Sequence, residues 1–178
     1  MTTAENPWTL SELPPGLVAL VGDESAGKTT WLQCLSGGMP SVSGPEPQAE
    51  AVWLDLRLPQ QDEDTPLQVW AQLRAQHPRW NPDLHGDLVQ ALSLEAHVHK
   101  RLNMLSAGTR RKVMLIAALA SGASVTLLDQ PFVALDMASI QVVLDFLHEA
   151  ADHPERAWIV ADYEAPSDLH LADLLHLR

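Results

Sequence analysis

Basic side chains are scarce in this chain of 178 residues, which carries 11 lysines and arginines against 23 aspartates and glutamates. The formal net charge is −12. Proteins that hold nucleic acid neutralise its phosphates with clusters of lysine and arginine. The composition therefore predicts no nucleic-acid partner, and we expect the basic cluster Arg110–Lys112 to lie at a nucleotide interface instead.

Cysteine pairs, long apolar runs and a leader sequence are also missing. Cys34 is the single cysteine, so no internal disulfide forms, and a reducing compartment and a buried, inert thiol are expected. No apolar run approaches the roughly 20 residues that span a bilayer. Met1–Asn6 lacks the charged and apolar regions of a signal peptide. We expect a soluble chain, long enough for one well-buried domain and short for two.

Against these absences stands the segment Gly22–Thr30, which matches the phosphate-binding pattern G-x-x-x-x-G-K-[ST] at every fixed position. A glycine-hinged loop of this kind turns backbone N–H groups toward phosphate oxygens, Lys28 reaches the β- and γ-phosphates, and the Thr29 hydroxyl ligates Mg²⁺. The alternative, a chance glycine-rich turn, fits poorly because a buried strand at Leu17–Val21 and a helix at Thr29–Leu35 are expected on either side. The residues expected to hold the nucleotide are Gly22, Asp23, Glu24, Ser25, Ala26, Gly27, Lys28, Thr29 and Thr30.

Three further segments follow in order. Leu105–Lys112 resembles the LSGGQ signature of ABC-type ATPases, with Ala107 in place of a glycine and Thr109 in place of the glutamine. Val125–Pro131 looks like the Walker B strand of that family, and Ala134–Asp136 looks like its D-loop. The chain thus resembles an ABC-type ATPase from Gly16 to about Val160. Among these it is most similar to the short haem-export type of cytochrome c maturation, because of the LSAG variant and the small helical insert.

The resemblance implies an α/β P-loop NTPase fold, with a mostly parallel sheet flanked by helices. It implies one ABC ATPase domain over 1–178, with a small helical subdomain at about 62–104 that docks onto a membrane partner in relatives. Residues 1–16 are polar and proline-rich, so the antiparallel strands that usually precede the phosphate loop are expected to be trimmed.

The remaining elements are expected from apolar runs and helical spacing. Strands are predicted at Ala51–Leu56, Ser124–Leu128, Ala157–Ala161 and within Leu171–Leu177. Helices are predicted at Pro66–Gln76, His85–Leu92, Gly108–Leu119 and Ser139–Ala150, with Trp80–Pro82 as a turn.

The family resemblance also implies ATP and Mg²⁺ as cofactors. Asp129 ends the Walker B strand, where a carboxylate holds Mg²⁺ through water. Ser106, Ala107 and Gly108 bind, in this family, the γ-phosphate held by the opposite subunit. A head-to-tail homodimer, or a heterodimer with a second ABC ATPase, is implied, together with a membrane permease and a cytoplasmic location at the inner face of the membrane.

Two positions depart from the family pattern and bear on catalysis. Gln130 stands where active members carry a glutamate that polarises the attacking water, and an amide accepts no proton at neutral pH. General-base assistance, worth about 10²–10⁴ in rate, is expected to be missing. Asp162 stands at the position of the switch histidine, where a carboxylate adds repulsion toward the γ-phosphate. The alternative is that Asp162 serves as a displaced base.

Two other family positions have only candidate residues. Gln60 or Gln61 is the candidate for the Q-loop glutamine that touches Mg²⁺, with Gln61 taken as the metal ligand, although Arg57 lies nearer the expected place. Trp8 is the candidate to stack on adenine, with plain packing as the alternative.

Two functions are consistent with these motifs. One is an ATP-binding subunit of an ABC transporter with weak or absent hydrolysis, and the other is a nucleotide-dependent assembly or regulatory module in which ATP holds a dimer together. A small-molecule P-loop kinase fits less well, because it has no use for an LSAG segment.

Overall fold

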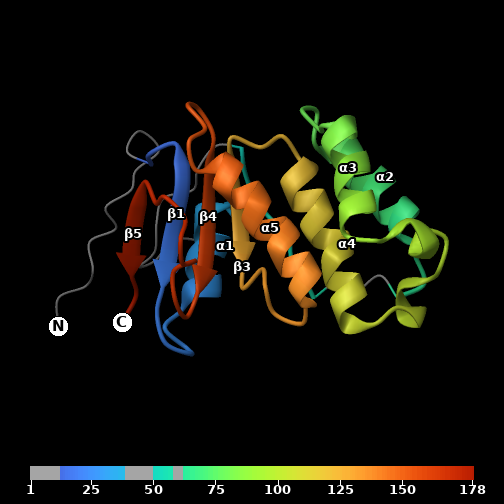
Figure 1. Cartoon of the computed structure of the whole chain (residues 1–178), viewed down its shortest axis with the longest axis horizontal. Helices are drawn as coiled ribbons and strands as arrows, with labels where there is room; N and C mark the ends of the chain where they lie inside the picture. The colour runs from blue at the N-terminus through green and yellow to red at the C-terminus, as the bar shows by residue number, and fades with distance from the viewer. Residues whose placement is uncertain (1–12, 39–49, 58–61) are drawn as a thin grey trace. The chain divides into compact units, whose positions relative to one another are not determined.

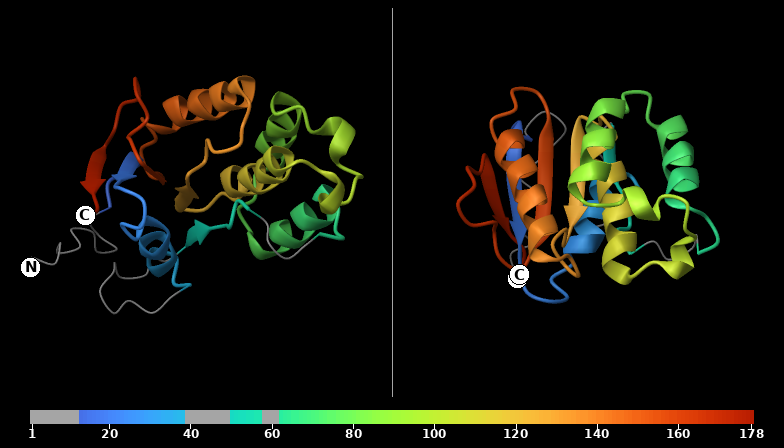
Figure 2. Two further views of the ribbon diagram at one scale, coloured as in Figure 1. Left: turned by 90° about the horizontal axis from the view of Figure 1, so that it is seen from below. Right: turned by 45° about the vertical axis from the view of Figure 1, so that its right-hand side comes forward.

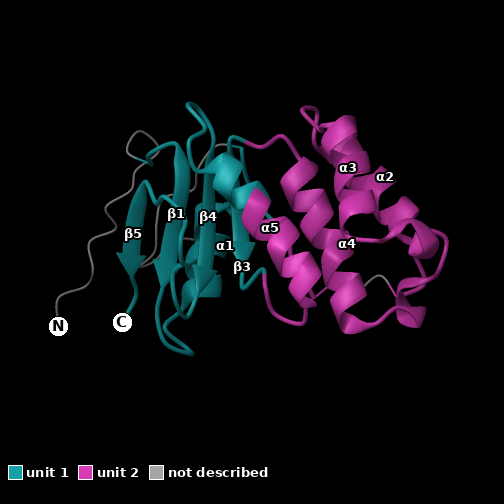
Figure 3. Cartoon of the chain, in the orientation of Figure 1, with its two compact units in different colours: residues 1–53, 124–131, 146–178 teal, residues 54–123, 132–145 magenta. Residues whose placement is uncertain are grey.

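The computed structural model describes residues 13–38, 50–57 and 62–178. These residues form two compact units, shown in two colours in Figure 3. The first unit comprises residues 1–53, 124–131 and 146–178, and the second comprises residues 54–123 and 132–145.

The first unit is built on a five-stranded sheet (Figure 1). Its strands are β1 (Gly16–Val21), β2 (Ala51–Trp53), β3 (Val125–Asp129), β4 (Ala157–Asp162) and β5 (Asp173–His176). They run in the order β2-β3-β4-β1-β5, and every neighbouring pair is parallel. The parallel sheet expected from the buried apolar runs is confirmed.

The register of this sheet aligns the ends of its central strands. Val21 at the end of β1 lies opposite Asp162 of β4, and Asp129 at the end of β3 lies opposite Ala161. Ligands of open parallel sheets bind beyond the carboxyl ends of the strands. The segments that follow β1, β3 and β4 are therefore brought to one edge of the sheet.

The two faces of the sheet are covered by different helices (Figure 2). Successive strand side chains point to opposite faces. Val18, Leu20, Leu127 and Ile159 form a buried cluster with Trp31, Leu32 and Leu35 of helix α1 (Lys28–Leu35). On the other face, Trp158 packs edge-on against Phe146, with ring centroids 5.9 Å apart. Phe146 lies near the end of helix α5 (Met137–Ala150), whose last five residues belong to this unit.

The second unit is helical. It holds α2 (Pro66–Gln76), α3 (Pro82–Ala91), two short 3-10 helices at Glu95–His97 and Leu102–Met104, α4 (Ala107–Ala120) and the beginning of α5. The Trp70 indole N–H donates to the carbonyl oxygen of Val113 at 2.8 Å, which ties α2 to α4. The apolar face predicted for α4 is buried, including Val113, Ile116, Ala117 and Ala120.

The strand predicted at Ala51–Leu56 is shorter than expected, since β2 ends at Trp53. Beyond it, the Asp55 carboxylate accepts the backbone N–H and the side-chain Nε–H of Arg57, both at 2.9 Å. Aspartate that bonds the backbone two residues on favours a turn over an extended chain.

The helix predicted at His85–Leu92 begins three residues earlier, at Pro82. The Asn81 side chain accepts the backbone N–H of Leu84 at 3.0 Å and caps the helix. Proline is favoured at the first helical position because its missing N–H is not needed there. The predicted turn at Trp80–Pro82 is therefore wrong at its last residue.

Cys34 is buried and carries no disulfide, as expected. No helix among the described residues combines the length and the apolar character needed to cross a bilayer. The expectation of trimmed N-terminal strands falls largely on residues 1–12, which lie outside the described residues.

Candidate nucleotide-binding site

The loop between β1 and α1 has a backbone that glycine favours. Gly27 has φ of 86° in the left-handed region, and no side chain caps the N-terminus of α1 that follows it. The first N–H groups of such a helix have no partner within the helix and carry partial positive charge. A helix N-terminus of this kind is suited to an anion.

Lys28 is buried and turned back onto the loop. Its Nζ donates to the backbone carbonyl oxygens of Gly22 at 2.6 Å and Asp23 at 2.8 Å. The same ammonium lies 4.7 Å from the centre of the Tyr163 ring, a cation–π contact. The lysine is thus held in place by the loop and by the segment after β4.

Thr29 and Asp129 meet although 100 positions separate them in the chain. The Thr29 hydroxyl donates to Asp129 Oδ2 at 2.6 Å. Mg²⁺ prefers hard oxygen donors and is usually held by one or two side chains together with substrate phosphates and water. This hydroxyl and carboxylate pair fits that donor set.

A cavity of about 380 Å³ opens beside this pair. Its lining combines the loop and the segments after β3 and β4, and consists of Glu24, Ser25, Ala26, Gly27, Lys28, Thr29, Thr30, Asp129, Gln130 and Tyr163. Gln130 has φ of 47°, and its backbone N–H donates to Ala161 of β4 at 2.8 Å. The pocket is therefore polar, with the ammonium of Lys28, the oxygen pair of Thr29 and Asp129 that suits Mg²⁺, and the amide of Gln130 on its lining.

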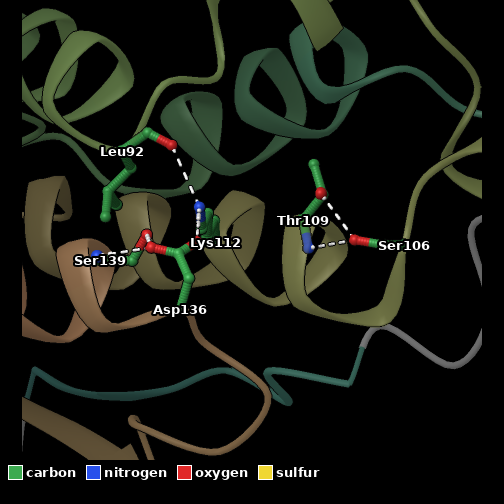
Figure 4. A network of polar contacts seen from close by, with 6 residues as sticks. All are labelled: Leu92, Ser106, Thr109, Lys112, Asp136 and Ser139. Atoms are coloured by element: carbon green, nitrogen blue, oxygen red, sulfur yellow. Dashed lines mark hydrogen bonds and ion pairs between the residues drawn. The ribbon is translucent and has the colours of Figure 1, made fainter.

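In the second unit, the signature-like segment forms the start of α4 (Figure 4). Ser106 caps the helix, because its Oγ accepts the backbone N–H of Thr109 at 3.1 Å. Ala107 is the first residue of α4. A Cβ added to Gly108 would lie 2.3 Å from the carbonyl oxygen of Ala134, so only glycine fits there.

Asp136 links α4 to the start of α5 in the same unit (Figure 4). Its carboxylate accepts from Lys112 Nζ at 2.9 Å and from the Ser139 backbone N–H at 2.8 Å. The lysine contact, followed by those of Ser139, holds the pKa of Asp136 far below its usual range. Arg110 in turn pairs with Asp62. In the described residues, then, the basic cluster makes ion pairs within its own unit.

Known proteins match this chain in sequence. The family model described as "ABC transporter" matches residues 10–133. The "Cytochrome c biogenesis ATP-binding export protein CcmA" of Pseudomonas syringae is 30% identical over 156 residues, which cover 81% of this chain and 72% of that protein. The chain belongs to the ABC transporter family of ATP-binding proteins.

Other ABC proteins match a larger share of this chain. The "Molybdenum import ATP-binding protein ModC" of Bordetella pertussis is 31% identical over 181 residues, covering 91% of this chain and 49% of that protein. The chain therefore spans about half the length of this relative. A solved ABC transporter ATP-binding protein from Pyrococcus furiosus superposes with a TM-score of 0.73 at 22% identity, covering 91% of this chain and 84% of that one. The α/β P-loop NTPase fold expected from the sequence is confirmed.

Several residues singled out from the ABC motifs do not line the cavity. Gly22 and Asp23 contribute carbonyl oxygens to Lys28 instead. Ser106, Ala107 and Gly108 belong to the second unit. Trp8, Gln60 and Gln61 lie outside the described residues, while Arg57 is paired with Asp55.

The end of β4 differs most from the ABC-based expectation. Asp162 is absent from the described lining of the cavity, and its Oδ1 accepts the backbone N–H of Tyr163 at 2.8 Å. Tyr163, one residue later, lines the cavity instead. The sequence carried one signal for it, namely an aromatic residue directly after a strand whose carboxyl end meets the phosphate loop.

Proposed function

We propose that this chain is the ATP-binding subunit of an ABC transporter, and that it binds Mg-ATP in the cavity beside the phosphate loop. The observation that carries the proposal is the convergence of Lys28 and the Thr29–Asp129 pair on one cavity. Lys28 would hold the β- and γ-phosphates, and Thr29 and Asp129 would hold Mg²⁺, with Asp129 acting through water. An Mg²⁺ ion held by these two residues would supply positive charge that offsets the negative charge of the phosphates.

We propose that hydrolysis is slow. Gln130 lines the cavity beside Asp129, where its amide hydrogen-bonds water without taking up a proton. The loss of a general base costs about 10²–10⁴ in rate. Asp162, at the expected place of the switch histidine, is the second proposed defect.

We further propose that the two compact units belong to one ABC ATPase domain that pairs head to tail with a second one. Ser106, Ala107 and Gly108 would then complete the nucleotide site of the partner. The partner is a second copy of this chain or another ABC ATPase, and a membrane permease would hold the pair at the inner face of the membrane. Relatives named for export and for import both match, so no substrate is proposed.

Molar mass measured by light scattering with and without Mg-ATP, with phosphate release followed in the same samples, tests this proposal. We expect a dimer that requires ATP and negligible release. The Lys28→Ala variant is the control, and it should remain monomeric with ATP. Steady release by the unaltered chain would contradict the proposed defect, and a monomer throughout would contradict self-pairing and point to a different partner.

A nucleotide-dependent assembly or regulatory module is the second candidate, and Gln130 favours it, because slow turnover gives a long-lived ATP-bound dimer. Purification of the tagged chain in mild detergent from the membranes of the cells that naturally make it distinguishes the transporter subunit from the module. An integral membrane protein that copurifies in stoichiometric amount supports the transporter subunit. An ATP-dependent dimer without one supports the module.

A further inference from the structure

Tyr163 is the single tyrosine of the chain, and it stands directly after β4 at the edge of the sheet where the cavity opens. Its ring lies over the Lys28 ammonium, 4.7 Å from the ring centre, and half of the residue is exposed, at 50%. Beyond the loop itself, the described lining of the cavity has three residues. Asp129 ends β3, Gln130 follows it, and Tyr163 follows β4.

The place of the ring identifies the part of the nucleotide that it would meet. The lysine of a phosphate loop reaches the β- and γ-phosphates, so a group stacked on Lys28 lies at the phosphate end of the site and away from the base. Gln130, proposed above to contact the attacking water, lines the same cavity. Tyr163 is therefore at the end where ATP and ADP differ.

We propose that Tyr163 is a specificity residue that distinguishes ATP from ADP. Its phenol O–H would donate a hydrogen bond to the γ-phosphate, which ADP lacks. This inference rests on the proposed function, since it requires that the cavity take a nucleotide. A phenol O–H donates a hydrogen bond without adding charge. That matters here because Glu24 and Asp129 already place carboxylates on the lining.

Asp162 acts as the positioning residue for this contact. Its carboxylate accepts the backbone N–H of Tyr163 at 2.8 Å, which fixes the chain where it leaves β4. The carboxylate at the expected histidine position thereby holds the turn that presents the phenol. Neither the ring nor its hydroxyl is needed for the Lys28 contacts with Gly22 and Asp23, which are made by backbone oxygens.

Calorimetric titration of the full chain with Mg-ATP and with Mg-ADP tests the inference. The Tyr163→Phe variant keeps the ring over Lys28 and removes only the hydroxyl. Loss of a hydrogen bond to a charged group should weaken Mg-ATP binding by about tenfold or more, with Mg-ADP binding unchanged. The matched control is Glu164→Gln, in the same loop but outside the described lining of this cavity, which should change neither affinity.

Two results would overturn the inference while leaving nucleotide binding intact. One is a Tyr163→Phe variant with unaltered Mg-ATP affinity, and the other is an equal loss for Mg-ATP and Mg-ADP. Failure of the unaltered chain to bind either nucleotide would instead overturn the proposed function, and this inference with it.

A spectroscopic readout follows from the presence of one tyrosine. Incorporation of 3-fluorotyrosine gives one ¹⁹F resonance, which reports Tyr163 alone. We expect Mg-ATP to shift this resonance and Mg-ADP to leave it near its nucleotide-free position. Equal shifts with both nucleotides would contradict recognition of the γ-phosphate.

Discussion

At the scale of single residues, Gln130 is the residue that we propose slows the hydrolysis of bound ATP. Gln130→Glu restores a carboxylate that accepts a proton, but Asp162 remains at the expected histidine position. We expect the variant to recover only a small part of the rate enhancement that a general base supplies, which is about 10²–10⁴. Phosphate release under single-turnover conditions measures this. Full recovery by the single change would refute the account with two defects.

Thr29 provides a second test at this scale. Thr29→Val keeps the branched shape but removes the hydroxyl that donates to Asp129. We expect the gain in ATP affinity on adding Mg²⁺ to be lost, because one of the two oxygen donors is missing. Thr29→Ser keeps the hydroxyl and serves as the control. Calorimetry with Mg²⁺ or with excess chelator measures the gain, and an undiminished gain in the valine variant would exclude the threonine as a metal ligand.

His85 makes stability depend on pH. Its ring lies 4.6 Å from that of Trp70 and 5.4 Å from that of Trp80, and burial, aided by the charge of Arg74, lowers its pKa below the usual 6.5. Between the lowered pKa and about 6.5, the unfolded chain binds a proton that the folded chain does not. The contribution of His85 to the free energy of unfolding should therefore be fully present above pH about 6.5 and should decrease as the pH drops below that value.

Urea unfolding of His85→Gln at several pH values measures this contribution. We expect a lower free energy of unfolding near neutral pH and a shallower decline on acidification than in the unaltered chain. His77, whose pKa burial also lowers, accounts for part of the remaining slope. His148→Gln, at an exposed position of α5, is the control. An unchanged slope in His85→Gln would disprove the assignment.

At the scale of elements, the start of α2 depends on a reciprocal cap. The Thr65 hydroxyl accepts the Gln68 backbone N–H, and the Gln68 side chain accepts the Thr65 backbone N–H at 2.8 Å. Thr65→Ala should lower the free energy of unfolding by about 1 kcal/mol. Thr65→Ser should lower it by much less, since it keeps the cap. Equal losses in the two variants would show that the methyl group matters and the cap does not.

Element types followed from local patterns, but several boundaries did not, and the largest departures are the end of β2 and the start of α3. Helix α2 was predicted with its observed bounds, and Thr65, Pro66 and Gln68 mark its start within four residues. The early end of β2 depends on the side-chain orientation of Asp55, and the early start of α3 depends on Asn81 acting as a cap. In both places the side chain can form more than one hydrogen bond with the nearby backbone, and the sequence does not show which one forms.

The candidate site likewise has residues that could be predicted from local sequence and residues that could not. The phosphate loop was predictable because its chemistry is contained in nine consecutive residues, Gly22–Thr30. Asp129 followed from the resemblance, and its contact with Thr29 required the β3 strand to be placed beside the loop. Tyr163 was missed because only the fold shows which of two neighbouring side chains after β4 enters the cavity.

At the scale of the whole molecule, the first unit depends on pairings between distant parts of the chain. Strand β1 pairs with β4 and β5, both near the C-terminus. A chain that ends at Arg156 lacks both partners and should fail to unfold cooperatively or to bind Mg-ATP. A chain that ends at Ala172 keeps β4 and should retain more folded material. Calorimetric melting and gel filtration distinguish these outcomes, and a cooperatively folded shorter chain would contradict the dependence.

The position of β1 has a consequence for how the protein is made. This apolar strand is the first of the described strands to leave the ribosome, and the two strands that pair with it are the last. Until β4 and β5 have been made, the two hydrogen-bonding edges of β1 are open to other chains, which is the condition under which strands aggregate. The nascent chain should therefore depend on a chaperone to cover β1 until β4 and β5 have been made.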